Sequence, residues 1–167
     1  MTPEEIQRAN QTYRRSIGRQ TPVTPRLLQE LYDPSVGPIL DFGAGTDAVH
    51  TVALRDAGYN VTAHDFGRNV GPLIDPLALS RQYAVVFASN VLNVQSSEEM
   101  LRATLGQIRG AMRSVALINY PSSPRKADIS SSRMLAILRE TFREVSVLRP
   151  KTQTVGLKTA LVMRVRL

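Results

Sequence analysis

The residues best suited to chemistry in this sequence lie in a glycine-rich turn. The stretch ILDFGAGTDAVH, residues 39–50, places Gly43 and Gly45 on either side of one alanine, directly after a short apolar run that contains Asp41. Because a glycine has no Cβ, a turn of this kind lets the backbone approach a bound ligand closely. The stretch therefore predicts a site for a nucleotide-like ligand, and three ligand classes have to be weighed.

The first class is a phosphate, as bound by nucleotide hydrolases, and the turn lacks what that class requires. A phosphate loop ends in Gly-Lys-Ser/Thr, whereas Thr46, Asp47 and Ala48 supply no lysine. The anionic Asp47 would also repel a phosphate. These residues argue against the hydrolase interpretation.

The second class is a dinucleotide, and two features favour it. Residues 43–48 satisfy the spacing G-x-G-x-x-G/A, and Asp65 follows at about the distance expected of an acid that holds ribose hydroxyls. The third class is a ligand with a positively charged group, such as an ammonium or a sulfonium. Asp41 favours this class, because a carboxylate two residues before Gly43 opposes a pyrophosphate and suits a positive charge. The alternative of a nicotinamide-dependent oxidoreductase stays open.

Several segments, in chain order, resemble the class I methyltransferases that use S-adenosylmethionine. Residues Ile39–Thr46 resemble motif I of that family, and Asp65 and Phe66 match its ribose-binding acid and the neighbour that packs on adenine. Asp75 matches the acid that accepts from the adenine amino group, and Ser89–Val94 matches the segment that passes the methionine end. The resemblance implies S-adenosyl-L-methionine as the cofactor. The cofactor-binding residues that it implies are Asp41, Gly43, Ala44, Gly45, Asp65, Phe66, Asp75 and Asn90.

The resemblance covers about residues 38–167 and has departures from the family pattern. Asp47 stands at the third glycine of motif I, and Asn93 stands where many small-molecule enzymes carry an acid or a histidine. Gln82 begins a strand that often starts with an acid. No Asn-Pro-Pro-Tyr follows that strand, which argues against the common amino-methylating DNA enzymes.

Alternating strands and helices predict the architecture that positions the turn. The pattern is typical of an α/β, doubly wound, mostly parallel sheet with helices on both faces. The last two strands are separated by a short loop, so they are expected to pair antiparallel. Seven strands are predicted, at about residues 37–42, 59–65, 73–74, 83–90, 112–120, 144–149 and 159–167, with helices at about 48–58, 97–109 and 130–142.

Two helical patterns precede the first strand, and each begins with Thr-Pro. They predict a division into an N-terminal helical arm, residues 1–37, that covers the substrate side, and a methyltransferase catalytic domain, residues 38–167. The catalytic part contains no inserted recognition domain. Self-association into a homo-oligomer, or a partner subunit, could therefore complete the site.

Composition narrows the setting of the protein. The 167 residues include no cysteine and two histidines, which excludes disulfides and thiolate chemistry and argues against a protein-built metal site. No apolar run approaches the roughly 20 residues of a membrane span. The N-terminus also lacks an apolar signal core. A cytoplasmic location without a membrane partner is expected.

The net charge of +7 arises mainly in residues 101–167, which hold thirteen basic and three acidic residues. Because arginine suits phosphate, this charge favours a nucleic acid, RNA or DNA, as the methyl acceptor. The segment after the fourth strand favours a small molecule instead, and a non-catalytic cofactor-fold subunit is a further alternative. Asn90 and Tyr120 are expected to position the acceptor, and Tyr120, Arg125 and Lys126 to contact it. No catalytic base is assigned.

Overall fold

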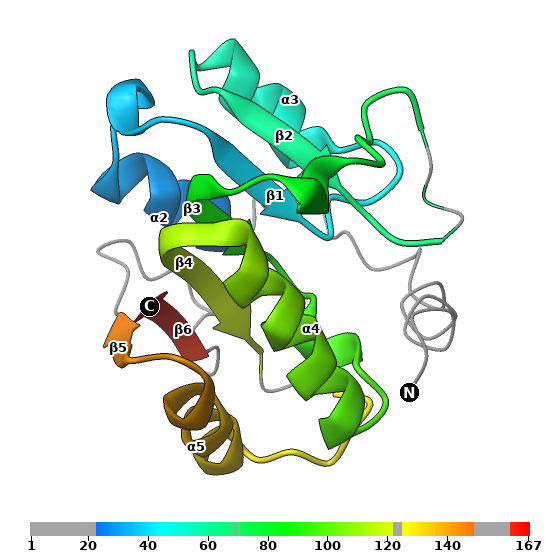
Figure 1. Ribbon diagram of the computed structural model, residues 1–167, viewed down its shortest axis with the longest axis vertical. Coiled ribbons are helices and arrows are strands. Elements are labelled where there is room, and N and C mark those ends of the chain that lie inside the picture. The colour runs from blue at the N-terminus through cyan, green and yellow to red at the C-terminus, as the bar shows by residue number, and fades with distance from the viewer. Residues whose placement is uncertain (1–22, 68, 70, 122–124, 149–160) are drawn as a thin grey trace.

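A six-stranded sheet forms the centre of the protein (Figure 1). The computed structural model describes residues 23–67, 69, 71–121, 125–148 and 161–167. The strands are β1 (Ile39–Phe42), β2 (Val61–His64), β3 (Tyr83–Ala88), β4 (Met112–Tyr120), β5 (Glu144–Leu148) and β6 (Leu161–Arg166). They lie in the order β2-β1-β3-β4-β6-β5. The first four strands pair in parallel, whereas β6 is antiparallel to both of its neighbours.

Helices cover both faces of this sheet. They are α2 (Val23–Leu31), α3 (Val49–Asp56), α4 (Glu98–Ala111) and α5 (Ser131–Thr141), with three short 3-10 helices η1 (Pro34–Val36), η2 (Ala78–Ser80) and η3 (Leu92–Val94). Leu28 of α2 and Leu54 of α3 pack in one apolar cluster with Val85 of β3. Leu105 of α4 packs in another cluster with Val86. Successive residues of β3 therefore face different helical layers, which confirms the doubly wound arrangement.

The predicted number of seven strands is wrong for the described residues, which form six. The third predicted strand is reduced to one parallel bridge between Ile74 and Ala63 of β2, where the Asp75 N–H donates to the Ala63 carbonyl at 2.9 Å. Pro72 and Pro76 stand on either side, and a proline offers no N–H to a strand ladder. The segment is therefore limited to a single bridge at the β2 edge.

The predicted antiparallel C-terminal pair is confirmed by β5 and β6. β6 lies between β4 and β5, so β5 runs in the same direction as β4. We call the edge at which β1 to β5 end the carboxyl edge, and the edge at which they begin the amino edge. The turn expected between β5 and β6 lies outside the described residues.

The described part of the N-terminal arm packs against the sheet. Leu28 of α2 is fully buried in a cluster with Ile39 and Leu117, and Leu27 contacts Val162 of β6 in another. The first predicted helix lies within residues 1–22, outside the described residues. The domain boundary after residue 37 and the covering role of the arm stay predictions.

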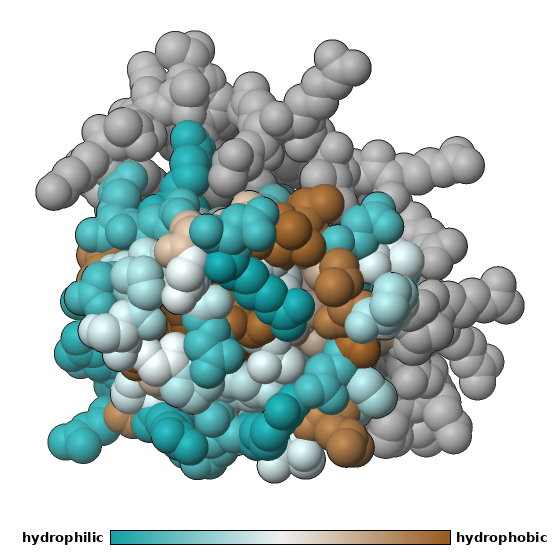
Figure 2. Space-filling view, turned by 90° about the horizontal axis from the view of Figure 1, so that it is seen from above, coloured by the Kyte–Doolittle hydropathy of each residue, from teal (hydrophilic) through white to brown (hydrophobic). Residues whose placement is uncertain are grey.

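Few large apolar side chains are exposed among the described residues. On the side shown in Figure 2, hydrophilic residues cover most of the described surface, and hydrophobic residues form smaller groups between them. Leu77 is the most exposed large apolar side chain among the described residues, at 68 %. In the same part of the chain, no helix has the length and the apolar composition of a membrane span.

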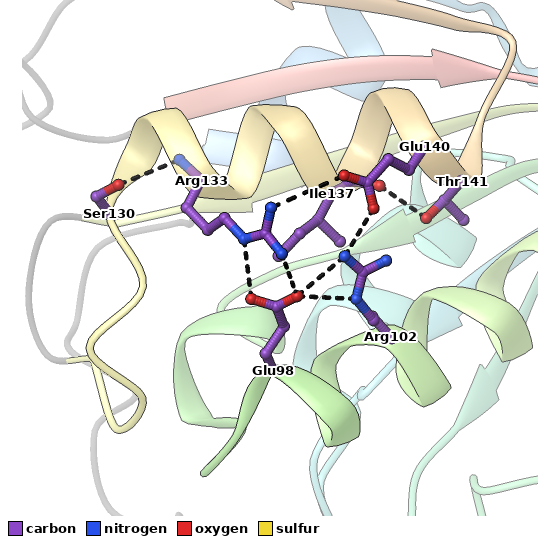
Figure 3. Close-up of polar contacts among 7 residues, drawn as sticks. All are labelled: Glu98, Arg102, Ser130, Arg133, Ile137, Glu140 and Thr141. Carbon is purple, nitrogen blue, oxygen red and sulfur yellow. Dashed lines mark hydrogen bonds and ion pairs between the residues drawn. The ribbon is translucent and has the colours of Figure 1, made fainter.

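An ion-pair network joins α4 to α5 (Figure 3). Glu98, in the first turn of α4, accepts hydrogen bonds from Arg102 at 2.9 Å and from two nitrogens of Arg133 on α5 at 2.6 and 2.9 Å. Arg102 also donates to Glu140 of α5 at 2.7 Å. The network adds polar contacts at the exposed side of the two helices, outside their apolar interface.

Replacing Glu98 tests how much this network stabilises the fold. We expect Glu98→Gln to lower Tm slightly at low salt and to have no effect at high salt, because exposed pairs are weak and screened. Glu30→Gln is the matched control, since Glu30 is exposed on α2 and forms no ion pair within the described residues. Thermal melts at two salt concentrations would refute the expectation if the two variants had the same Tm at low salt.

Candidate functional site

The end of β2 holds the glycine turn in place. The N–H groups of Gly43 and Ala44 both donate to the carbonyl of His64 at 2.9 Å. The N–H of Gly45 donates to the carboxylate of Asp65 at 2.5 Å. Three consecutive amides of the turn are therefore bonded to two consecutive residues of the chain. A pyrophosphate cradle needs such amides to be directed at its ligand, so this arrangement differs from a dinucleotide site.

Gly43 places the turn against the segment that follows β3. Its φ is +82°, and a Cβ built on it would lie 2.5 Å from the Cγ2 atom of Val91. Any side chain at position 43 would therefore be strained and would clash within the protein itself. The structure thus brings motif I and the segment around Asn90 into contact, as the sequence predicts for parts of one site.

Asp41 is a buried carboxyl group at the carboxyl edge. It is 1 % exposed, and the hydroxyl of Thr51 on α3 donates to its Oδ2 at 2.8 Å. Burial raises the pKa of Asp41 to about 7; the Thr51 hydrogen bond opposes this change and the charge of Asp65 adds to it. No described cation pairs with Asp41. A ligand with a positive group would stabilise its charged form.

Asp65 links the turn to the loop after β2. Its Oδ1 accepts from the N–H of Phe66 at 2.6 Å and from the Asn69 side-chain amide at 3.1 Å. Asn69 in turn accepts a hydrogen bond from the Thr46 hydroxyl at 3.1 Å. The carboxylate is only partly buried. Its predicted role on ribose hydroxyls stays a prediction, and Asn69 is a supporting residue that the sequence analysis did not find.

Thr51 is the second residue that the sequence analysis missed. A buried carboxylate needs a donor, and Thr51 is the sole hydroxyl on α3, the helix that follows the turn. That combination was available in the sequence as a signal. The structure identifies Thr51 as the donor to Asp41, because it shows that the face of α3 carrying Thr51 lies on β1.

Phe66 belongs to an aromatic cluster beneath this loop. Its ring makes an edge contact with Phe42 at 5.3 Å and another with His64 at 4.7 Å between ring centroids. Phe66 is 8 % exposed, so it lies at the boundary of the core. Packing of Phe66 on an adenine ring stays a prediction.

Asp75 is engaged with its own loop in this structure. One carboxylate oxygen accepts from the Leu77 N–H at 2.8 Å, and the other pairs with Arg81. These contacts lower the pKa of Asp75, the Leu77 bond most strongly. The predicted contact with an adenine amino group would have to compete with them, and it stays a prediction.

Asn90 and Asn119 form a reciprocal amide pair at the ends of β3 and β4. The Asn90 N–H donates to the Asn119 Oδ1 at 2.6 Å, and the Asn119 side-chain amide donates to the Asn90 Oδ1 at 2.7 Å. Asn90 has a φ of +58°, which is uncommon for a residue with a Cβ. Asn119 is buried and Asn90 is exposed, so the pair presents a fixed polar side chain at the carboxyl edge.

Tyr120, which the sequence predicts to contact and position the acceptor, is buried in this structure at 1 % exposure. Its hydroxyl donates to the carbonyl of Ile129 at 2.8 Å, and the Arg125 guanidinium lies 4.0 Å from its ring centroid. Arg125 itself donates to the Pro121 carbonyl at 2.7 Å and to the Ser131 hydroxyl at 2.9 Å. Both residues therefore hold the loop after β4 instead of presenting themselves to an acceptor.

Lys126 is the exposed member of the predicted substrate residues. Its backbone N–H donates to the Asn93 carbonyl at 2.9 Å, which ties the loop after β4 to the segment after β3. Contact of its side chain with an acceptor stays a prediction. The described residues contain no group of three or more His, Asp or Glu side chains that could hold a metal ion.

Comparisons with known proteins report on the fold. The sequence matches no protein-family model and no curated protein. A TehB-like SAM-dependent methyltransferase from Corynebacterium glutamicum is similar in structure, with a TM-score of 0.63 at 16 % identity over 84 % of this chain and 85 % of that one. The glycopeptide N-methyltransferase MtfA, complexed with S-adenosylhomocysteine, has a TM-score of 0.62 at 13 % identity, covering 85 % and 87 % of the two chains.

A third similar structure is the 1,6-didemethyltoxoflavin-N1-methyltransferase of Burkholderia thailandensis. It was solved with 1,6-didemethyltoxoflavin and S-adenosylhomocysteine, and it has a TM-score of 0.57 at 17 % identity over 84 % of this chain and 74 % of that one. The protein therefore has the Rossmann-like fold of class I S-adenosylmethionine-dependent methyltransferases. The resemblance stated from the sequence is confirmed at the level of the fold.

The buried carboxyl of Asp41 predicts a pH dependence of stability. Its pKa of about 7 exceeds the ordinary value of 3.8, so between these values the native state holds a proton that the unfolded state has lost. The Asp41 contribution to the free energy of unfolding therefore falls as pH rises through this interval. We expect Asp41→Asn to raise Tm at about pH 8 but to have little effect on it at about pH 4.

Thermal melts of the ligand-free protein across this pH range measure the effect. Asp56→Asn, on the exposed end of α3, is the control and should keep the wild-type profile. If Asp41→Asn also kept the wild-type dependence of Tm on pH, the pKa of Asp41 would not be raised in the native state, and the prediction would be wrong.

Proposed function

We propose that the protein is an S-adenosylmethionine-dependent methyltransferase that acts on a small molecule. The observation that carries the proposal is the buried Asp41 carboxyl, which has a hydroxyl but no cation beside it among the described residues. A cofactor with a positively charged end would supply the missing cation. S-adenosylhomocysteine in the similar MtfA and toxoflavin methyltransferase structures supports this cofactor.

A nicotinamide dinucleotide fits these residues less well. Asp41 and Asp65 place two carboxylates at the glycine turn, where a pyrophosphate would be repelled. The amides of Gly43 and Ala44 are also bonded to His64 of β2, and that of Gly45 to the side chain of Asp65, which follows β2. The oxidoreductase alternative would require both features to change on binding.

The basic charge lies largely away from the proposed site. Arg113, Arg143 and Arg166 are exposed where β4 and β5 begin and the antiparallel β6 ends, and the Arg143 N–H donates to the Arg166 carbonyl at 3.0 Å. They therefore lie together at the amino edge. Arg125, at the carboxyl edge, is used inside its own loop. The described arginines thus give less support to a nucleic-acid acceptor than their position in the sequence suggested.

A small-molecule acceptor is the better supported alternative. The similar structures include a methyltransferase solved with 1,6-didemethyltoxoflavin and one named for glycopeptides. The catalytic task of the chain is then to orient an acceptor and to exclude water, an effect worth about 7–11 kcal/mol at its best. When bound, the cofactor would supply an electrophilic methyl group on a sulfonium.

The residues at the carboxyl edge divide this task. Asp41 would attract the positive end of the cofactor, Asp65 would accept from its ribose hydroxyls, and Phe66 would pack on its base. Asn90, fixed by Asn119, would lie beside the methionine end and orient the acceptor. None of the described residues is assigned as a general base. Such a base is required only for an acceptor that keeps its proton at neutral pH.

Ligand-dependent melting tests the proposed cofactor. We expect S-adenosylhomocysteine to raise Tm and NAD and NADP to leave it unchanged, since a ligand at 100 times its Kd stabilises by about 2.7 kcal/mol. Asp65→Asn should reduce the shift, because it removes a carboxylate that serves both the turn and the ribose. Asp56→Asn is the matched control and should retain the shift. Selective stabilisation by NAD would overturn the proposal.

Transfer of a labelled methyl group tests the acceptor class. The protein would be incubated with methyl-labelled S-adenosylmethionine and a cell extract divided into small molecules and nucleic acids. We expect the label in the small-molecule fraction. Label that becomes soluble only after nuclease treatment would restore the nucleic-acid alternative.

A further inference from the structure

His64 is a buried polar side chain that the proposed function does not yet use. It is 7 % exposed, and neither its Nδ1 nor its Nε2 has a hydrogen-bond partner among the described residues. A neutral imidazole carries one donor and one acceptor, and both are then unsatisfied. Leaving a buried polar group without a partner is costly, whereas an apolar side chain of similar size would incur no such cost.

The position of His64 relates this cost to the candidate site. It is the last residue of β2, and the strand register pairs Phe42 with both His64 and Ala88. These three side chains therefore share one face of the sheet in the layer next to the carboxyl edge. Ligands of open parallel sheets bind at that edge.

Two neighbours of His64, Asp65 and Phe66, are the residues that the proposal assigns to the nucleoside part of the cofactor. Its ring makes an edge contact with Phe66 at 4.7 Å and lies 5.4 Å from the Phe42 ring. Its carbonyl accepts from the amides of Gly43 and Ala44, and Asp65 follows it directly in the chain. A displacement of His64 would thus also displace the glycine turn, Asp65 and the ring of Phe66.

Other buried hydroxyls without a partner have a simpler explanation. Thr104 is fully buried on α4, and its Oγ1 has no hydrogen-bond partner among the described residues. A helical threonine can satisfy its hydroxyl by rotating toward a carbonyl of the preceding turn. The His64 imidazole packs against two aromatic rings, and neither of its nitrogens has a hydrogen-bond partner among the described residues. A bound ligand would supply that partner.

We propose that His64 determines the specificity of the site for the base of the cofactor, by hydrogen bonding to the edge of a heteroaromatic ring that packs near Phe66. The inference rests on the proposed function. Adenine offers both ring-nitrogen acceptors and an amino donor at its edge, which complements a neutral imidazole. Burial lowers the pKa of His64 and the charges of Asp65 and Asp75 oppose this, which favours the neutral ring at neutral pH.

Calorimetric binding of S-adenosylhomocysteine to three forms of the protein tests the inference. We expect His64→Leu to bind it about five- to tenfold more weakly than the wild type, as for the loss of one hydrogen bond. The same variant should raise the Tm of the ligand-free protein, because it removes unsatisfied buried nitrogens. Thr104→Val is the matched control, since it removes another buried group without a hydrogen-bond partner among the described residues, at a distance from the site on α4, and should leave binding unchanged.

Discrimination between bases separates a specificity role from general damage to the site. S-inosylhomocysteine, in which an oxygen replaces the adenine amino group, should bind the wild type more weakly than S-adenosylhomocysteine. His64→Leu should narrow that preference, whereas a merely structural change would weaken both ligands equally. His64→Gln, which keeps a donor and an acceptor, should recover part of the preference.

The outcomes distinguish this inference from the proposed function. If the wild type binds S-adenosylhomocysteine and His64→Leu binds it equally well with the same preference, His64 is a packing residue and the inference is wrong. A wild type that does not bind S-adenosylhomocysteine would overturn the cofactor proposal, and the inference with it.

Discussion

The attachment of the glycine turn to the end of β2 is the constraint on which the rest of the candidate site depends. Through the carbonyl of His64 and the carboxylate of Asp65, two residues fix three consecutive amides of the turn. This attachment sets the left-handed φ of Gly43 against Val91 and so joins motif I to the segment after β3. α3 follows this turn and brings Thr51 to Asp41.

Several groups at the carboxyl edge carry costs that a ligand would relieve. Asp41 is buried without a cation among the described residues, His64 without a hydrogen-bond partner there, and Asn90 has a left-handed backbone. Each of these features is unfavourable for folding alone. Their concentration at the end of the sheet where ligands bind is the physical basis for placing function there, whereas the amino edge carries exposed arginines.

Short sequence segments were sufficient to predict much of the fold. The glycine turn, the apolar strands around it and the alternation with helices are all encoded within short segments, and β1, β3 and β4 lie where the sequence places them. The third strand failed because the two prolines around Leu73 and Ile74 outweigh their apolar character. The burial of Tyr120 could not be predicted, because it depends on contacts with Arg125 and Ile129 that no local pattern reports.

For the candidate site, the sequence predicted the motif residues but not their hydrogen-bond partners. Asp41, Asp65 and Asn90 lie at one edge as the topology requires, but their partners Thr51, Asn69 and Asn119 depend on the rotation of α3 and on side-chain contacts between distant segments. The placement of the basic residues also depends on strand direction. Arg113 lies at the start of β4 and Arg166 ends the antiparallel β6, so both lie at the amino edge, opposite the glycine turn.

Assignment of the backbone amides by NMR, followed by titration with S-adenosylhomocysteine, tests the central claim most directly. The account predicts large shift changes for the amides of Gly45, Asp65, Phe66 and Asn90, with small changes for Arg113, Arg143 and Arg166. Changes confined to the amino edge, or the same set of changes on titration with NAD, would contradict it.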